Sequence, residues 1–497
     1  MRKSQLFILL AITIVYSSCT KEINVDSAGT TLLHMPQQNR GFIVIAKEGE
    51  NLSGITASIS TLGGKDLVLK SVIKELGLIL VQTPNPVFAE RARAIKGVEA
   101  VAVDVITNWR QPERSEKISK AQIASATKGK KPIVNNNPYS FLQWGIQSVN
   151  AEKAWQKGYG GKGAKVAVLD GGFILGDSEI APAIILTHSF IDGETPEYKG
   201  GGGFSISHGT HVAGTIAAAN DGEGVIGIAP DAKLILVKVL SDKTGSGPWS
   251  SIINGIYYAA VNDADVINMS LGGELPTRDF IDDNGTPDDP SDDMLVSYRK
   301  DIKPLINAMN RATLFANLRG ATVIAAAGND GYNYDVEKDF ITYPAHSLGV
   351  ISIASNGPLG WGFNQDTTLH VPSIFTNSGR NFVSYGAPGG NYGWPISSAV
   401  ATVGGITNYE YVFNFVFNVG GIDEDTNDLY YVWMSGTSMA APHASAVAAL
   451  LYGKYGKYCS PLLVDYILKA SARDLGAKGN DRFFGKGQIN AGKAVSY

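Results

Sequence analysis

The sequence has only two cysteines among its 497 residues, Cys19 and Cys459. A scaffold stabilised by several disulfides is therefore excluded. The chain also lacks a strong excess of charge of one sign, since 42 Lys and Arg stand against 46 Asp and Glu, a formal net charge of −4. Proteins that bind nucleic acid by neutralising many phosphates need a basic surplus. We therefore expect no nucleic-acid partner.

The apolar run at the amino terminus is too short to cross a bilayer as a helix. It extends from Leu6 to Tyr16, which is 11 residues, whereas a membrane-spanning helix needs about 20. Basic residues precede the run, and the small pair Ser17-Ser18 follows it. This order is typical of a secretory signal peptide. We therefore expect residues 1–18 to be a signal peptide and the mature protein to be extracytoplasmic.

Cys19 directly follows the small residues. In this position it resembles the acylated cysteine of bacterial lipoproteins, which implies a lipid anchor on Cys19 and attachment to a membrane. Plain secretion, with cleavage nearby, is the alternative. The polar residues 19–37 predict a tether. If Cys19 is acylated, Cys459 has no cysteine partner within the chain, and stability must come from packing or from bound ions.

A small domain is expected over residues 38–109. Its apolar pattern predicts the order β-α-β-β-α-β, which is typical of a ferredoxin-like α+β domain. The expected strands are Gly41–Ala46, Leu67–Ile73, Gly77–Thr83 and Val98–Thr107, and the expected helices are Ser53–Leu62 and Pro86–Ile95. Residues 110–137 have many charged and small residues and no apolar period, which predicts an accessible linker.

Residues 138–497 alternate between short apolar runs and helical patterns. This alternation predicts an α/β domain with a doubly wound, mostly parallel sheet and helices on both faces, whose site lies at the carboxyl ends of the strands. The expected strands are Lys165–Asp170, Leu234–Leu240, Val266–Met269, Thr322–Ala327 and Val350–Ala354. The expected helices are His211–Ala219, Ile252–Val261, Leu305–Leu318 and Met439–Leu451.

Three segments supply residues suited to acyl transfer. Asp170 ends an apolar strand, and an acid there can orient a histidine. His208 stands just before an Ala-rich helix. Ser438 lies at another helix start, where backbone N–H groups and the positive end of the helix dipole favour developing negative charge. Pro442 is expected near the first turn of that helix, where N–H groups lack helical partners.

Each of these residues also has a simpler interpretation. Ser438 could be only a helix cap, and Asp170 could cap the turn that follows it. His208 and His211, three residues apart, could bind a metal ion. No Glu stands between them and no third ligand is apparent, so metal binding is the weaker hypothesis.

Together the three segments resemble the subtilases, the subtilisin-like serine proteases, which carry Asp, His and Ser in this order. The resemblance covers Gln143 to Ala494 and includes a closing motif at Phe484–Asn490. It implies that Asn329, in Val323–Gly331, completes the oxyanion hole. It also implies two substrate-binding segments: Ser270, Leu271 and Gly272 beside the primary specificity pocket, and Gly245, Ser246 and Gly247 at the opposite edge.

The resemblance implies a serine endopeptidase that needs no organic cofactor. Ser438 is then the nucleophile, His208 the base and Asp170 the residue that holds the imidazole. Residues 38–109 resemble the inhibitor propeptide of the family, so the implied partners are a protein or peptide substrate and the chain's own propeptide. Two other hypotheses stay open: a catalytically weak, lipid-anchored peptide-binding protein, and an esterase or acyl transferase that uses the same acyl-enzyme.

Three features depart from the family pattern. Gly171 follows Asp170, where the family usually has Thr or Ser. Residues 274–304 and 390–432 look like insertions. The aromatic run Tyr409–Phe417 in the second could be a hairpin over the rim of the active site, a surface that binds substrate, or packed core, and packing as an alternating strand is favoured. Asp282–Asp293 contains six Asp and one Asn. These oxygen ligands suit a structural calcium ion, although an acidic loop can also be simply solvated.

Overall fold

The computed structural model describes residues 40–109, 114–128, 137–176, 178–200, 206–282, 294–393, 395–423 and 428–497. The predicted signal peptide, Cys19, the tether and the acidic loop, except for its end at Asp282, lie outside the described residues. No helix within these ranges is long and apolar enough to cross a membrane.

Residues 40–103 form a four-stranded antiparallel sheet in the order β2-β3-β1-β4. The predicted β-α-β-β-α-β order is therefore confirmed. The predicted last strand ends early, and β5 pairs outside this sheet with β10. The elements are β1 (Arg40–Ala46), α1 (Leu52–Gly63), η1 (Gly64–Asp66), β2 (Val68–Ile73), η2 (Lys74–Leu76), β3 (Leu78–Thr83), α2 (Phe88–Arg93), β4 (Val98–Val103) and β5 (Ile106–Asn108).

Strand β1 is buried on both of its faces. Phe42 and Val44 pack in one cluster with residues of α1 and α2. Ile43 and Ile45 point the other way and pack in a second cluster, with residues of helices α7 (Trp249–Val261) and α8 (Lys303–Leu318). Because successive side chains of a strand alternate between faces, burial on both sides explains the unbroken apolar run.

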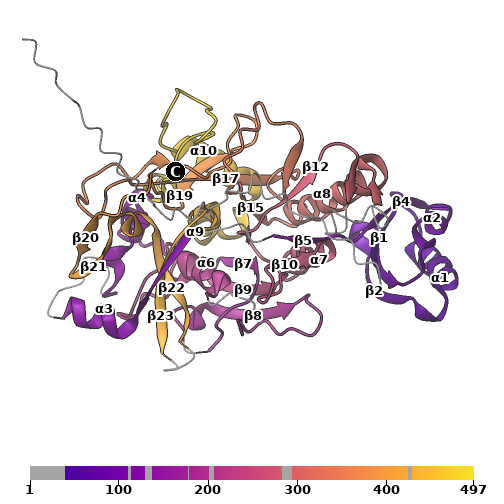
Figure 1. The fold of residues 1–497 in the computed structure, drawn as a ribbon, viewed down its shortest axis with the longest axis horizontal. Coiled ribbons are helices and arrows are strands. Elements are labelled where there is room, and N and C mark those ends of the chain that lie inside the picture. Colours follow the sequence, from indigo (N-terminus) through magenta and orange to yellow (C-terminus); the bar gives the residue numbers. More distant parts are fainter. Residues whose placement is uncertain are drawn as a thin grey trace, which may run out of the picture. The chain divides into compact units, whose positions relative to one another are not determined.

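An eight-stranded, mostly parallel sheet forms the centre of the following domain (Figure 1). Its order is β18-β17-β15-β11-β7-β9-β8, with β19 also beside β17, and within this sheet β18 is antiparallel to β17. The predicted doubly wound fold is confirmed. The strands are β7 (Lys165–Asp170), β8 (Ile184–Ser189), β9 (Lys233–Lys238), β11 (Val266–Met269), β15 (Thr322–Ala326), β17 (Val350–Gly357), β18 (Val371–Pro372) and β19 (Tyr385–Pro388).

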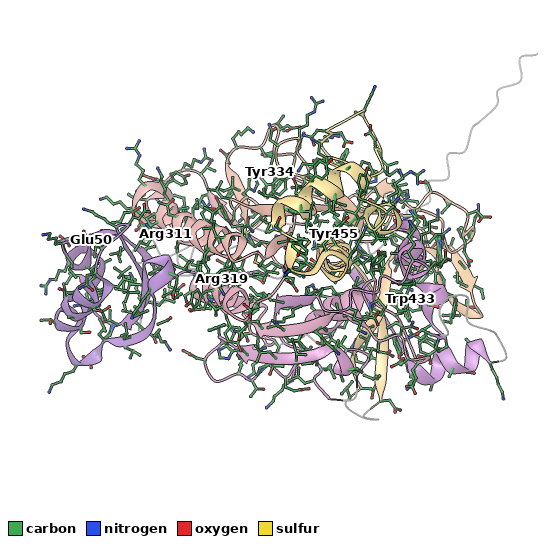
Figure 2. The ribbon with its side chains drawn as sticks, turned by 180° about the vertical axis from the view of Figure 1, so that it is seen from behind. Glu50, Arg311, Arg319, Tyr334, Trp433 and Tyr455 are labelled. Carbon is green, nitrogen blue, oxygen red and sulfur yellow. The ribbon has the colours of Figure 1, made fainter. Side chains whose placement is uncertain are left out.

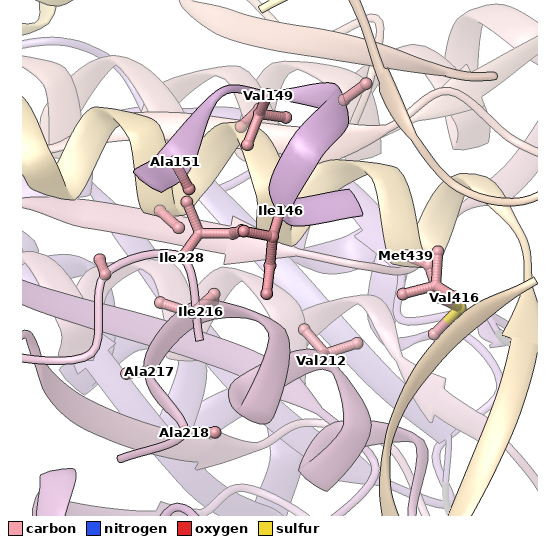
Figure 3. Packing of buried hydrophobic residues seen from close by; sticks show 14 of the residues in the cluster. Ile146, Val149, Ala151, Val212, Ile216, Ala217, Ala218, Ile228, Val416 and Met439 are labelled. Carbon is pink, nitrogen blue, oxygen red and sulfur yellow. The ribbon is translucent and has the colours of Figure 1, made fainter. Parts of the chain in front are cut away.

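Helices cover both faces of this sheet. Val166 and Val168 of β7 belong to a core cluster with residues of α6 and α9, whereas Ala167 and Leu169 belong to the cluster that contains α7 and α8. The alternation along one strand thus separates two hydrophobic layers. Figure 3 shows part of the first layer, including Val212, Ile216 and Met439. The helices are α6 (His208–Ala217), α7 (Trp249–Val261), α8 (Lys303–Leu318) and α9 (Thr437–Tyr455).

The other described elements are shorter or lie outside the central layers. The helices and turns are α3 (Lys120–Thr127), η3 (Ser140–Leu142), α4 (Trp144–Ser148), α5 (Ala151–Trp155), η4 (Ala181–Ala183), η5 (Tyr298–Ile302), η6 (Glu410–Asn414), η7 (Gly456–Tyr458), α10 (Pro461–Ser471) and α11 (Ala491–Ala494). The strands are β6 (Arg114–Ser119), β10 (Ser246–Pro248), β12 (Gly273–Pro276), β13 (Phe280–Asp282), β14 (Met294–Val296), β16 (Phe340–Tyr343), β20 (Val400–Val403), β21 (Ile406–Tyr409), β22 (Val416–Ile422) and β23 (Leu429–Ser435).

The prediction that residues 110–137 form only a linker is wrong for residues 114–127. Strand β6 pairs antiparallel with β23, the strand that leads to Ser438, and α3 follows it directly. Ile118 and Ile123 are buried in the main core. Two apolar residues among charged neighbours give no apolar period from which a strand could be predicted. The strand that pairs with β6 lies some 300 residues away in the sequence.

The two expected insertions are also partly core. Gly273–Pro276 forms β12, a buried strand paired with β16, so the first expected insertion begins with residues that belong to the folded core. In the aromatic run, Phe413, Phe415 and Phe417 are at most 1% exposed, which confirms the expected packing. The run is not one alternating strand, because its middle forms the 3-10 turn η6.

Candidate active site

Asp170 and His208 meet at the carboxyl end of the parallel sheet. Asp170 is the last residue of β7, and His208 is the first residue of α6, whose N-cap is Ser207. His208 Nδ1 lies 2.9 Å from both carboxylate oxygens of Asp170. Because an ionised carboxylate only accepts hydrogen bonds, Nδ1 must carry the proton, which leaves Nε2 of a neutral ring as an acceptor.

The helix begins three residues earlier than the predicted His211. His211 therefore lies inside α6, where its Nε2 is 3.1 Å from the carbonyl oxygen of Val416. Within the described ranges, no three His, Cys, Asp or Glu side chains gather as a metal site. The two histidines thus have different surroundings, and His208 is the one that faces the acid.

Gly171, the residue after Asp170, contacts the Asp170 carboxylate through its backbone. The N–H of Gly171 donates to Asp170 Oδ1 at 2.7 Å. The carbonyl of Gly171 in turn accepts from Lys238 Nζ, which is fully buried. Lys238 also lies 3.1 Å from Glu194 Oε2 and 3.5 Å from Asp242 Oδ2. Although burial opposes it, hydrogen bonds from Ser241 and Lys238 hold the pKa of Glu194 below its ordinary value. The sequence analysis did not identify this buried ion cluster.

Ser438 is the second residue of α9, and its Oγ donates to the carbonyl of Ser270 at 3.3 Å. Pro442 is the sixth residue of this helix, where an N–H would have a helical acceptor, so the expectation that this position lacks one is wrong. Proline has no N–H to donate to the carbonyl four residues earlier, which is that of Ser438. Ser270 Oγ donates to that carbonyl instead, at 2.7 Å. Ser270, expected to bind substrate, thus supports the turn that carries Ser438.

The Asn329 side chain is held by the same helix start. Its Oδ1 accepts from both the backbone N–H and the hydroxyl of Thr437, each at 2.8 Å. Its Nδ2 is buried and has no hydrogen-bond partner among the described residues. A buried donor without a partner costs about 1–3 kcal/mol. The amide therefore presents a fixed, unused donor beside the helix start.

An extended segment of the chain lies between the two expected substrate-binding segments. Strand β5 pairs antiparallel with β10, and the N–H of Trp109 donates to the carbonyl of Gly245 at 3.2 Å. On the other side, the N–H of Gly272 donates to the carbonyl of Trp109 at 3.0 Å. Trp109 is fully buried and its ring lies 5.0 Å from that of Trp249. Leu271 packs in the core with α7 and α8.

A model of the subtilase family matches residues 161–487, about two thirds of the sequence. The chain belongs to the subtilase family. It is 31% identical over 424 residues to the thermostable alkaline protease of Halalkalibacterium halodurans, covering 84% of this chain and 91% of that protein. It is 30% identical over 366 residues to thermitase of Thermoactinomyces vulgaris, covering 73% of this chain and 99% of thermitase.

A solved structure shows the same fold over most of this subtilase. The epidermin leader peptide processing serine protease from Staphylococcus aureus superposes with a TM-score of 0.65 at 19% identity. The superposition covers 92% of this chain and 98% of that chain.

This subtilase also has a cluster of oxygen atoms that could serve as metal ligands, which no sequence motif predicted. The Asn137 Nδ2 atom lies 2.9, 2.5 and 2.8 Å from the carbonyl oxygens of Ala219, Glu223 and Val225. An amide has two N–H groups and cannot satisfy three carbonyls. The adjacent carboxyl of Glu179 is buried, which raises its pKa to about 7, and it accepts from the Tyr431 hydroxyl. Most of these oxygen atoms belong to backbone carbonyls, so their position cannot be predicted from side-chain identity.

Proposed function

We propose that this subtilase is a serine endopeptidase that forms an acyl-enzyme on Ser438. The Ser438 hydroxyl attacks the scissile carbonyl carbon while His208 Nε2 takes its proton, and Asp170 holds the ring through Nδ1. The resulting oxyanion accepts hydrogen bonds from Asn329 Nδ2 and the Ser438 backbone N–H. His208 then protonates the leaving amine, and water hydrolyses the ester by the same steps.

The orientation of Asn329 is the observation that supports this proposal most strongly. Thr437 fixes Oδ1, and the buried Nδ2 is left without a partner in the described part of the chain. A group that only shaped a turn would gain by pairing this donor. A preorganised donor is what a developing oxyanion requires, because it costs no reorganisation at the moment of reaction.

Two alternatives act on the same fold: an esterase or acyl transferase, and a peptide-binding protein with weak catalysis. Burst kinetics with an activated ester and with a peptide amide distinguish them. An endopeptidase turns over both substrates, an esterase only the ester, and a binding protein gives no acyl burst. Ser438→Ala should abolish the burst with either substrate, and a burst that survives would contradict the assignment of the nucleophile.

We propose that residues 40–109 are an inhibitory propeptide. β5 and Trp109 occupy the backbone partners that a substrate would need at Gly245 and Gly272. Arg311 of α8, labelled in Figure 2, donates to the carbonyls of Ala46 and Leu76 at 3.0 and 3.1 Å and to Glu99 Oε2 at 2.7 Å. Removal of this domain should therefore open the cleft, and the Ser438→Ala precursor should keep it attached.

We propose that the mature protein is extracytoplasmic and anchored to a membrane by an acylated Cys19. The support is the order of basic residues, short apolar run, small residues and cysteine at the amino terminus. The anchor would keep the enzyme at a membrane surface, where its substrates are proteins or peptides that reach that surface.

We propose that a structural calcium ion binds beside Asn137 and not in the acidic loop Asp282–Asp293. Carbonyl, amide and carboxylate oxygens are the donors that Ca²⁺ prefers, and a turned Asn137 amide would add Oδ1 to the three carbonyls and Glu179. Calcium should raise the melting temperature, and Asn137→Leu should remove that gain. A gain that persists in Asn137→Leu and disappears when the acidic loop is replaced by Gly and Ser would contradict this placement.

A further inference from the structure

Two carboxyl groups, one buried and one half-buried, meet beside the cleft. Glu274 lies in β12, two residues after Gly272, whose N–H binds the carbonyl of Trp109. Asp330 directly follows Asn329. The carboxyl groups of Glu274 and Asp330 share a hydrogen bond, and Glu274 is only 3% exposed. The two acids thus come from the two segments that contact the substrate strand and the oxyanion.

This acid pair lacks a counter-charge in the described structure. Neither carboxyl forms an ion pair with a described Lys, Arg or His, and Glu274 Oε1 has no hydrogen-bond partner there. Asp330 Oδ2 accepts from Asn377 Nδ2 at 3.2 Å. Burial and the neighbouring Asp330 raise the pKa of Glu274 to about 8. Tyr332 and Tyr334, the latter labelled in Figure 2, are the other titratable groups that interact with the pair.

In the sequence, a basic residue directly follows the segment held in the cleft. Trp109 is hydrogen-bonded on both sides, to Gly245 and to Gly272, and the residue that follows it is Arg110. A guanidinium has five N–H donors in a planar fork, which suits two carboxyl groups side by side. A carboxylate as deeply buried as that of Glu274 is costly without a partner, and a hydrogen-bonded cation offsets part of that cost.

We propose that Glu274 and Asp330 form a specificity site for a basic side chain, Arg or Lys, on the residue just before the scissile bond. The inference rests on the proposed endopeptidase function. The shared proton leaves to solvent as the cation binds. In maturation the basic residue is Arg110: the bond between its carbonyl carbon and the Gln111 nitrogen breaks, and one water supplies the hydroxyl of the new carboxyl group and the hydrogen on the new amine.

The competing explanation is that the acid pair has only a structural role, holding β12 against the loop after β15. Removing one carboxyl would then change stability and would slow all substrates equally. A specificity site changes the ratio between substrates, and this ratio is the quantity to measure.

The first test uses peptides that differ only in the residue before the scissile bond: Arg, Lys, Gln or Leu. For the mature enzyme, kcat/KM should be about 10- to 100-fold higher with Arg or Lys than with Gln or Leu. Glu274→Gln keeps the size and can still donate to Asp330, yet it should lower the Arg-to-Leu ratio by about 10-fold or more. Glu337→Gln, an exposed acid in the same region, is the charge-matched control and should leave the ratio unchanged.

The outcomes separate the two proposals. Cleavage of all peptides with no basic preference, or a ratio unaffected by Glu274→Gln, overturns the specificity site and leaves the endopeptidase intact. No cleavage of any peptide or protein overturns the endopeptidase itself.

The second test follows maturation of the full-length precursor. Arg110→Gln should slow self-processing by about 10-fold or more, Arg110→Lys should retain it, and Arg114→Gln, four residues further on, should process normally. Amino-terminal sequencing of the first product should begin at Gln111. A different first residue, or normal processing of Arg110→Gln, overturns the assignment of Arg110.

Discussion

At the scale of single residues, Asn329 combines a structural role with the chemical role that we propose. Its oxygen binds Thr437 and stabilises the start of α9, while its nitrogen remains available. These roles belong to different atoms of the same amide, so a substitution that removes both changes both stability and rate. The two effects can be separated by comparing Asn329 with its partner Thr437.

We predict that Asn329→Leu lowers kcat by about 10²- to 10³-fold with little change in KM, because the lost hydrogen bond forms only with the oxyanion. It should also lower the free energy of unfolding by about 1–3 kcal/mol, since the Thr437 N–H loses its acceptor. Steady-state kinetics and denaturant unfolding measure the two effects.

Thr437→Val is the matched control for this prediction. It removes the hydroxyl that donates to Asn329 Oδ1 and leaves both Nδ2 and the backbone hydrogen bond. We expect a similar loss of stability and a much smaller loss of kcat. A folded Asn329→Leu enzyme with normal kcat would show that Asn329 only shapes the turn.

At the scale of elements, α9 depends on a residue from a different strand. Pro442 removes the helical hydrogen bond to the Ser438 carbonyl, and Ser270, just after β11, replaces it. Asn268 Nδ2 donates to Ser270 Oγ at 3.0 Å, and Ser445 of α9 donates to Asn268 Oδ1 at 2.8 Å. Ser438, the proposed nucleophile, is therefore positioned by a polar network between sheet and helix.

We predict that Ser270→Ala lowers the free energy of unfolding by about 1–3 kcal/mol, because the Ser438 carbonyl loses its donor. In a Pro442→Ala background the helix regains an N–H for this carbonyl, so the same change should cost less than about 1 kcal/mol. Denaturant unfolding of the four proteins gives the coupling energy. Equal costs in both backgrounds would mean that Ser270 does not compensate for Pro442.

The start of α7 provides a pH-sensitive contact with the amino-terminal domain. Asp104 accepts from the Ser250 N–H at 2.9 Å and from its hydroxyl. Burial raises the pKa of Asp104 to about 6, although the bonds from Ser250 act in the opposite direction. The unfolded carboxyl ionises near pH 4, so between about pH 4 and 6 the folded state binds more protons, and the free energy of unfolding falls as the pH rises.

We predict that Asp104→Asn removes this fall. Measured in the Ser438→Ala precursor, the stability of Asp104→Asn relative to its parent should rise by about 1–2 kcal/mol between pH 4 and pH 7. Asp66→Asn, an exposed acid of the same domain, serves as the control. A stability difference that stays constant over this pH range would contradict the role assigned to Asp104.

At the scale of the whole molecule, the described chain holds two domains in a single continuous packing. The sheet of the amino-terminal domain buries Ile43 and Ile45 against residues of α7 and α8, and β5 continues into the cleft. On the other side of the proposed cleavage site, β6 pairs with β23, which leads to Ser438. We therefore expect β6 and α3 to remain with the mature enzyme after processing, held by Ile118 and Ile123.

We predict that the full-length protein partitions into detergent phase and incorporates a fatty-acid probe, because the acyl chains on Cys19 favour an apolar environment. Cys19→Ala should remain unlabelled and in the aqueous phase. Cys459→Ala is the control and should label normally. An unlabelled wild-type protein would exclude the anchor and favour plain secretion.

Asp170, His208, Ser438 and Asn329 could be predicted from the sequence because each lies in a local motif at the junction of a strand or helix with a loop. The alternation of apolar runs likewise predicts the doubly wound sheet, since each strand and helix is defined by its own period. The β-α-β-β-α-β order of the first domain was predictable for the same reason. Each of these features depends on residues that are close together in the sequence, within one strand, one helix or one local motif.

Only the tertiary structure decided which distant residues meet. The donor to the Ser438 carbonyl is Ser270, the partner of Glu274 is Asp330, and the partner of β6 is β23. The oxygen atoms around Asn137 that could bind a metal ion are mostly backbone carbonyls. Every residue has such a carbonyl, so the sequence does not show which of them come together. Such contacts arise because the sheet brings the ends of separate strands to one edge. A short-range sequence pattern cannot show which of these distant residues become neighbours.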